Sequence, residues 1–204
     1  MNVRIRLIAH GGASHSLEAL CPNAEVYILE AALRSEGMPC DVVSYRGLDA
    51  SRPMAEQSSA SRMRGMVGWA SRLTGHWGGF PVLYQPSAAH DFQQPIELTQ
   101  ARVRQLLSSP ASVIAYYIEN RHDCHDAIML AAHVRDHGPD IHQTLIGPHA
   151  VRFGQSILGE HPSFDSVLTG DPLSGLLSLA DRLNTPDTWE GIPDFVFRNP
   201  EGVI

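Results

Sequence analysis

The chain has 204 residues, of which 43% are hydrophobic and 18% are charged, and its formal net charge is −7. This composition predicts a globular domain with a real core. A negative charge without a long basic run argues against nucleic acid or an anionic membrane as a partner. No stretch approaches 18 apolar residues, so neither a membrane span nor a signal peptide is predicted. Three sparse cysteines, Cys21, Cys40 and Cys124, favour a reducing, cytoplasmic environment over a disulfide framework.

The first part of the chain is predicted to form a strand, a helix and a second strand. Apolar runs and their boundaries place the first strand at Val3–Ala9 and the second strand at Asp41–Tyr45. The helix between them begins at Ala24 and is ended by Gly37. In the loop after the first strand, Gly11 and Gly12 permit positive φ and a close approach of the backbone to a ligand. Ser14 adds a hydroxyl group to this loop, which is therefore a candidate binding loop.

Residues 50–95 interrupt this alternation of strands and helices. Methionine, tryptophan and leucine lie there among Ser, Arg and Gly, which predicts a helix from about Ala55 to Leu73 followed by an irregular stretch. A structureless loop of this length is unusual in a compact domain. We interpret the segment as an insertion, a lid or a docking element, with a helix packed on the core as the plainer alternative. Ile96–Leu107 then returns to a helical pattern.

The chain is organised around residues 113–171, where three apolar strands each run into a polar loop. The predicted strands are Val113–Ile118, Ile141–Ile146 and Phe164–Leu168. Helices are predicted after each of them, at about Asp126–His137, after His149 and at Pro172–Leu183. This alternation predicts a parallel sheet with crossover helices. Such sheets bind ligands at the carboxyl ends of their strands, so the loops at 119–125, 147–149 and 169–171 are candidate site loops.

The last residues predict the start of a hairpin. Phe195–Arg198 is largely apolar, residues 199–202 form a turn, and Val203 and Ile204 begin a return strand. A hairpin cut off at its turn suggests that the natural polypeptide continued or that this is an excised domain. We therefore predict one α/β domain over residues 1–185 and a linker or hairpin segment over residues 186–204.

Several short motifs occur in an order that resembles a known family. They are Ile28–Gly37, Asp41–Tyr45, Leu145–His149, Val167–Asp171 and Ile192–Arg198. In this order and spacing the chain resembles the N-terminal cobalamin-binding domain of cobalamin-dependent radical S-adenosylmethionine enzymes, over nearly its whole length apart from residues 50–95. In that family Gly-Gly-Pro-His ends the fourth strand and Gly-Glu ends the fifth. Ile146-Gly-Pro-His149 and Gly170-Asp171 stand in those places here.

This resemblance implies a fold, a cofactor and a partner. The implied fold is a three-layer α/β/α fold of the flavodoxin or Rossmann type, with a five-stranded parallel sheet in the order 2-1-3-4-5. The implied partner is a radical S-adenosylmethionine domain, in another chain or in a missing C-terminal segment. The implied cofactor is cobalamin, held by loop residues at the carboxyl edge of the sheet: Gly11, Gly12, Ser14, Glu119, Asn120, Arg121, Gly147, Pro148, His149, Thr169, Gly170 and Asp171.

Two departures from the family limit what this chain does alone. The Cys-x3-Cys-x2-Cys motif of the radical domain is absent from the sequence, so we expect no iron–sulfur cluster and no independent catalysis by that chemistry. The Asp-x-His-x-x-Gly signature, whose histidine ligates cobalt in other cobalamin proteins, is also absent. Asp140-Ile-His142 matches its first three letters, but it enters a strand at the opposite end of the sheet and lacks the glycine.

Each candidate loop also has a plain structural explanation. Asp123 and Asp126 have the spacing of a capping box at the start of a helix. Gly147–His149 is equally consistent with an ordinary strand-to-helix turn. Asp171 precedes Pro172 and therefore suits an N-cap followed by a first-turn proline. A cap and a binding site can share one loop, so both explanations stay open.

Two groups of side chains have spacings that could bind a metal ion. His122, Cys124 and His125 could bind zinc, but three ligands so close in sequence give a cramped geometry. His133 and His137 have the i, i+4 spacing of a chelating pair. Their place in the last turns of a helix, where positive side chains favour the helix dipole, explains them more simply. We therefore predict no metal-ligating side chain.

Two further functions remain open from the sequence. A protein that kept the fold and lost the cofactor would be a scaffold or docking subunit, with partner contacts from Met63, Met66 and Trp69. A small-molecule enzyme would use acid–base groups in the crevice, namely His10, His149 and Asp171. The sequence contains neither a Gly-x-Ser-x-Gly nucleophile elbow nor a Gly-x-Gly-x-x-Gly dinucleotide fingerprint.

Overall fold

The structure is a computed structural model that describes residues 3–9, 24–44 and 96–199, without the side chains of residues 96–99 and 122. The described residues all belong to one compact unit. Several predictions fall outside them: the first loop with His10, Gly11, Gly12 and Ser14, the helix at 55–73 with Met63, Met66 and Trp69, and the return strand at 203–204.

Six strands form one sheet in the order β2-β1-β3-β4-β5-β6. Their bounds are Ile5–Ala9 (β1), Cys40–Ser44 (β2), Val113–Tyr117 (β3), His142–Ile146 (β4), Ser166–Leu168 (β5) and Phe195–Phe197 (β6). β1 to β5 run parallel and β6 pairs antiparallel with β5. The predicted α/β fold with five parallel strands in the order 2-1-3-4-5 is confirmed, and the sheet has a sixth, antiparallel strand in addition. β6, expected only as the start of a hairpin, is a sixth strand because its backbone pairs with that of β5.

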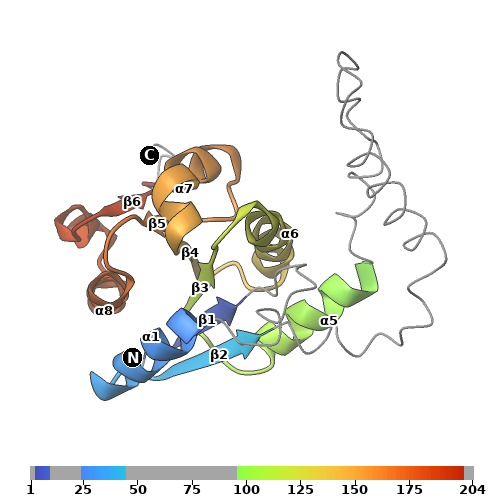
Figure 1. Ribbon diagram of the computed structural model, residues 1–204, viewed down its shortest axis with the longest axis horizontal. Coiled ribbons are helices and arrows are strands. Elements are labelled where there is room, and N and C mark those ends of the chain that lie inside the picture. The colour runs from blue at the N-terminus through green and yellow to red at the C-terminus, as the bar shows by residue number, and fades with distance from the viewer. Residues whose placement is uncertain (1–2, 10–23, 45–95, 200–204) are drawn as a thin grey trace, which may run out of the picture. The chain divides into compact units, whose positions relative to one another are not determined.

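Helices cover both faces of the sheet, which makes three layers (Figure 1). α1 (Ala24–Ser35), α8 (Pro172–Arg182) and the short 3-10 helix η3 (Pro186–Gly191) lie on one face. α5 (Ile96–Leu107), α6 (Arg121–His137) and α7 (Pro148–Glu160) lie on the other. None of the helices in the described part of the chain is long and apolar enough to cross a bilayer.

The central strands are buried along their whole length. Every residue of β1, β3, β4 and β5 is buried, as expected for parallel strands covered on both faces. Successive side chains alternate between the two layers of core. In β1, Ile8 packs with the cluster under α5, α6 and α7, while Ile5, Leu7 and Ala9 pack with the cluster under α1 and α8.

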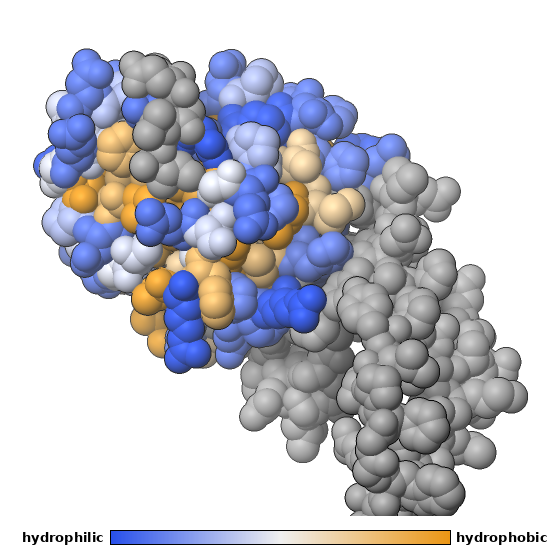
Figure 2. Space-filling view, turned by 90° about the horizontal axis from the view of Figure 1, so that it is seen from above, coloured by the Kyte–Doolittle hydropathy of each residue, from blue (hydrophilic) through white to orange (hydrophobic). Residues whose placement is uncertain are grey.

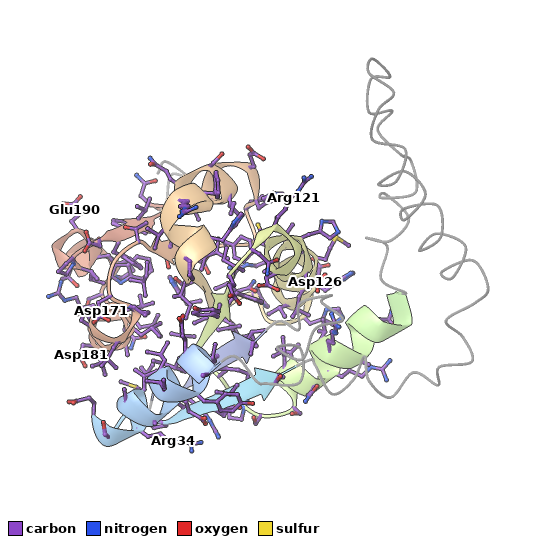
Figure 3. All side chains as sticks on the ribbon, in the orientation of Figure 1. Arg34, Arg121, Asp126, Asp171, Asp181 and Glu190 are labelled. Atoms are coloured by element: carbon purple, nitrogen blue, oxygen red, sulfur yellow. The ribbon has the colours of Figure 1, made fainter. Side chains whose placement is uncertain are left out.

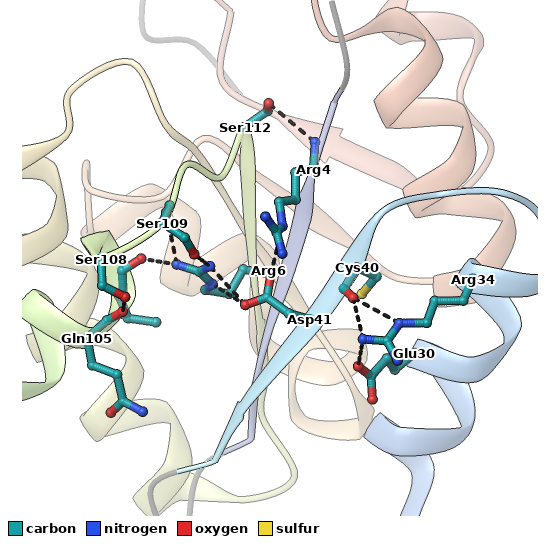
Figure 4. A network of polar contacts seen from close by, with 11 residues as sticks. Arg4, Arg6, Glu30, Arg34, Cys40, Asp41, Gln105, Ser108, Ser109 and Ser112 are labelled. Carbon is teal, nitrogen blue, oxygen red and sulfur yellow. Dashed lines mark hydrogen bonds and ion pairs between the residues drawn. The ribbon is translucent and has the colours of Figure 1, made fainter.

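Arg6 is a charged side chain at the second position of β1, and only 1% of its surface is exposed. Its Nε donates to Asp41 Oδ2 on β2 at 2.8 Å, and its terminal nitrogens donate to the Leu106 carbonyl oxygen and to Ser109 Oγ. Figure 4 shows the guanidinium held between β2 and the turn that follows α5. One side chain therefore ties together the two N-terminal strands and the connection from α5 to β3.

Residues 186–199 complete the α1–α8 face of the sheet. Trp189 and Ile192 are buried in that layer, and Trp189 makes an edge contact with the His142 ring at 5.1 Å between centroids. Elsewhere in the described part of the chain, five large apolar side chains are exposed: Tyr27, Ile28, Met129, Val151 and Phe153. On the face shown in Figure 2, apolar and hydrophilic side chains of the described residues lie side by side.

Candidate functional site

The strand order reverses between β1 and β3, so the switch point of the sheet lies at the carboxyl ends of these two strands. The chain leaves β1 towards β2 through α1 on one face and reaches β3 through α5 on the opposite face. Because the two helices diverge around the sheet, the space beyond β1 and β3 is the place where such folds bind ligands. Ala9 and Tyr117 are partners in the β1–β3 register, so these two strands end side by side.

The loop after β3 is shorter than predicted, because α6 begins at Arg121 and not near Asp126. The predicted cap, Asp123 with Asp126, is also wrong. Asn120 Oδ1 accepts from the Asp123 N–H at 3.2 Å, and Asp123 Oδ2 accepts from the Glu119 N–H at 3.1 Å and from Asn120 Nδ2 at 3.0 Å. Asn120 is therefore the N-cap and Asp123 its partner three residues later, as in a capping box.

Asp123 combines burial with a potential charge in the first turn of α6. Its side chain is buried, and this burial raises the pKa of the carboxyl group to about 6, against the opposing effect of the hydrogen bonds from the Glu119 and Asn120 backbone. The nearby charges of Glu119 and Asp126 raise the pKa further. Close to neutral pH, folding therefore keeps this carboxylate ionised at a cost in free energy.

Asp123→Asn tests that cost through the pH dependence of stability. A raised pKa means that the folded state binds the proton more tightly than the unfolded state does. Proton binding by Asp123 therefore stabilises the fold below pH 4, and this stabilisation is lost as the pH rises through about 6. Asparagine can accept the same hydrogen bonds without a charge. Relative to the unmodified protein, the variant should gain roughly 1–2 kcal/mol in free energy of unfolding between pH 4 and pH 7.

Urea denaturation at pH 4, 5, 6 and 7 measures this change. Asp136→Asn, at an exposed position near the end of the same helix, is the matched control and should show no comparable trend. A stability difference between Asp123→Asn and the unmodified protein that stays constant over this range, or that moves the other way, would contradict the raised pKa.

The loop after β4 is joined directly to the loop after β3. The His149 N–H donates to the Ile118 carbonyl oxygen at 3.1 Å, and the Ile118 N–H donates to the Ile146 carbonyl oxygen at 2.9 Å. Gly147 has φ 100° and ψ 175°, and a Cβ there would lie 2.8 Å from the Ile118 oxygen. Pro148 follows as the first residue of α7. Glycine at 147 thus allows the two loops to form one continuous backbone surface.

The His149 side chain lies on that surface, beside the start of α7. Its ring packs against Phe153 with 4.7 Å between centroids. Partial burial lowers the pKa of the imidazole, and the positive charge of Arg152 lowers it further; both effects favour the neutral ring. Arg121 is exposed at the start of α6, and Figure 3 shows it projecting from that helix, on the opposite side of the sheet from Asp171.

The loop after β5 is held by contacts with other residues of the same chain. Thr169 donates to the Asp194 carbonyl oxygen through its N–H at 2.8 Å and its Oγ1 at 3.0 Å. A Cβ at Gly170 would overlap the Asp194 side chain. Asp171 caps α8 by accepting from the Leu173 and Ser174 N–H groups at 3.4 and 2.9 Å, and these bonds lower its pKa. The predicted capping role of Asp171 is confirmed, and its lowered pKa does not suit an acid that must donate a proton.

A further polar pair lies at the end of β3. Tyr117 is buried at the last position of this strand, and its hydroxyl group donates to Glu25 Oε2 in the first turn of α1. Its neighbour Tyr116 points to the other layer and donates to Gln143 Oε1 at 2.5 Å. The sequence pattern predicts no site role for Tyr117 or Glu25. One sequence signal could have pointed to this pair: a tyrosine at the end of a buried strand needs a partner for its hydroxyl group.

No metal site appears among the residues that the structure describes. Within them there is no group of three His, Cys, Asp or Glu side chains that could hold an ion. Cys124 is buried in the core under α6, and His137 Nδ1 donates to the His133 carbonyl oxygen at 2.8 Å near the end of α6. His142 is buried and its Nε2 lies 2.7 Å from Ser166 Oγ. Burial lowers its pKa to about 4, so His142 is a neutral core residue.

The fold defines a doubly wound α/β protein, and its candidate site is the switch point between β1 and β3. No protein-family model matches the sequence, and no curated protein matches it. Its function is therefore argued from the residues themselves.

Proposed function

We propose that this chain is a cobalamin-binding module that works with a radical S-adenosylmethionine domain, located in another chain or in a further segment of the polypeptide. One observation carries the proposal: the loops at 118–121 and 147–149 are joined by hydrogen bonds and a close backbone contact into a single surface beside the switch point. A large planar cofactor needs a broad, preformed backbone surface of this kind.

At one part of the carboxyl edge of the sheet, the described residues suit a cofactor of this size. Glu119, Arg121 and Pro148 are exposed and His149 is partly exposed there, which supplies charged and polar side chains around the joined loops. Asn120 contributes to the cap of α6 and stays within the same loop. The loop at 169–171 is engaged with Asp194 and with α8, so we place the cofactor over the β1, β3 and β4 ends of the sheet.

The division of labour follows from the residues present. Bound cobalamin would supply cobalt-centred methyl transfer or related chemistry, while the chain binds and orients it. The sequence lacks the three-cysteine cluster motif, so a partner domain would supply the radical chemistry. The two cysteines of the described residues, Cys40 and Cys124, are free thiols, and burial raises their pKa. Unreactive free thiols suit the cytoplasm, where we place the module.

Incubation with hydroxocobalamin, followed by desalting and a visible spectrum, tests the proposal. The folded protein should retain corrin absorbance at micromolar concentration. Arg121→Ala should raise the dissociation constant about tenfold because it removes an exposed charged contact beside the joined loops. Arg104→Ala, exposed on α5 in its last turn, is the matched control and should bind as the unmodified protein does. A folded protein that retains no corrin absorbance overturns the proposal.

A further inference from the structure

We propose that the outer edge of β6 pairs with the same edge of a second copy of this chain, forming a dimer around a two-fold axis at Val196. Figure 1 shows β6 at one end of the sheet. The inference goes beyond the proposed function and does not rest on it, because β6 ends the sheet on the β5 side, away from the switch point between β1 and β3.

The backbone of β6 has hydrogen-bonding groups on the side away from β5. On the β5 side, the Arg198 N–H donates to the Asp165 carbonyl oxygen at 2.9 Å, and Val196 is a register partner of β5. In antiparallel strands, the backbone groups of successive residues point to opposite sides. The N–H and C=O groups of Phe195 and Phe197 therefore point outwards. Among the described residues, no further strand pairs with β6 on that side.

This outer edge is complementary to itself. In an antiparallel pair centred on Val196, Phe195 lies opposite the partner's Phe197, so each outward N–H group meets a C=O group. Each of these residue pairs can exchange two hydrogen bonds. Aromatic cross-strand pairs add to the stability of such a register. Because a two-fold axis closes the interface, assembly stops at a dimer and does not continue into a filament.

The side chains of β6 also suit a paired strand. Phe195 and Phe197 stack with 5.6 Å between ring centroids, and both make edge contacts with Trp189. All three residues of β6 are only partly buried. Natural edge strands are usually protected from pairing by charged residues or proline, and the three residues of β6 include neither. An edge of this kind is suited to pairing with a further strand.

The charges at the two ends of β6 favour the antiparallel orientation. Asp194 precedes the strand and Arg198 follows it. In the register centred on Val196, Asp194 lies across from the partner's Arg198, whereas a parallel pair in the same register would bring like charges together. Arg198 also donates to the Leu158 carbonyl oxygen. Its contribution to the orientation is therefore that of a charge and requires no further hydrogen bond.

The length of β6 determines how strong the association should be. A strand of three residues buries less surface than a permanent dimer needs, so the dimer should be weak and transient. We expect a dissociation constant of about 10–100 µM. Sedimentation velocity should show the 22.3 kDa monomer at low micromolar concentration and a species of twice that mass at several hundred micromolar.

An exchange of charges at Val196 tests the two-fold register. Val196 would lie opposite the same residue of the partner, so Val196→Lys and Val196→Glu should each weaken association at least tenfold, because like charges then face each other. An equimolar mixture of the two variants should associate about as strongly as the unmodified protein, because a lysine then faces a glutamate. Loss of folding cannot produce this recovery on mixing.

Val151→Lys and Val151→Glu are the matched controls. Val151 lies on α7 and is 51% exposed, so these variants should associate as the unmodified protein does, alone or mixed. Circular dichroism establishes that each variant is folded. An unmodified protein that stays monomeric at several hundred micromolar overturns the inference, and this result is expected if the return strand predicted at 203–204 pairs with β6 instead. Folded Val196 variants that associate no better mixed than apart overturn it as well. Both results leave the proposed function untouched, since corrin binding is measured separately.

Discussion

Replacing Arg6 by alanine should lower the free energy of unfolding by about 3 kcal/mol, since breaking a buried ion pair leaves its partners without compensation. Arg6 is almost fully buried and bonds to Asp41, to the Leu106 carbonyl oxygen and to Ser109. Alanine would leave these acceptors unsatisfied and open a void between β1 and α5. The Arg4 guanidinium, 3.4 Å from Asp41 Oδ1, remains as a partner for Asp41. The expected loss of stability is therefore near the lower end of the range for a broken buried ion pair.

Arg34→Ala is the matched control for this prediction. Arg34 also pairs with an acid and donates to a backbone oxygen, at 2.8 Å to Glu30 and 2.9 Å to the Cys40 carbonyl, as Figure 4 shows. Its side chain is 59% exposed, so its removal should cost less than about 1 kcal/mol. Urea or thermal denaturation of both variants gives the comparison. Equal losses for the two arginines would mean that burial does not set the strength of the Arg6 network.

Replacing Gly147 by alanine should destabilise the protein by about 2–4 kcal/mol. The backbone at φ 100° and ψ 175° lies in a region open almost only to glycine, where other residues lose about 1–3 kcal/mol. The new methyl group would also meet the Ile118 oxygen and nitrogen at 2.8 and 3.2 Å. These backbone atoms cannot move aside cheaply, because the Ile118 N–H is bonded to Ile146 and its oxygen to His149.

Gly37→Ala separates the two sources of this loss. Gly37 follows α1 with φ 79°, and a Cβ there would meet nothing within 4 Å. Its replacement should therefore cost only the strain of a left-handed backbone, about 1 kcal/mol. Chemical denaturation of the two variants shows the difference. If Gly147→Ala loses no more stability than Gly37→Ala, the close contact between the β3 and β4 loops does not contribute to stability, and the surface on which the proposed function depends is less rigid than inferred.

Local sequence signals predicted the parallel core correctly because each one depends on nearby residues. The run Val113–Ile118 is apolar throughout, as strands covered on both faces are, and the structure has β3 there with every residue buried. Asp171 before Pro172 predicted an N-cap, and the bonds from Leu173 and Ser174 confirm it. Asp140-Ile-His142 was judged to enter a strand, and His142 does begin β4.

Other predictions failed where two competing local signals were available. Asp123 and Asp126 have capping spacing, but so do Asn120 and Asp123, and the second pair starts the helix. The difference arises because Ile118 must reach Ile146 and His149, which leaves only a short loop before α6. The role of β6 was also missed, since a three-residue apolar stretch carries no sign of the strand with which it will pair.

The sequence by itself determined the layers of this protein and the loops that lie at the carboxyl edge, because hydrophobic periodicity and glycine positions are encoded residue by residue, while the strand order was implied by the resemblance. Only the tertiary structure decided which loops touch. It closes the β5 loop with Asp194 and joins Tyr117 to Glu25 across 92 positions of sequence. Contacts between residues so far apart depend on how helices pack on the sheet, which no local pattern specifies.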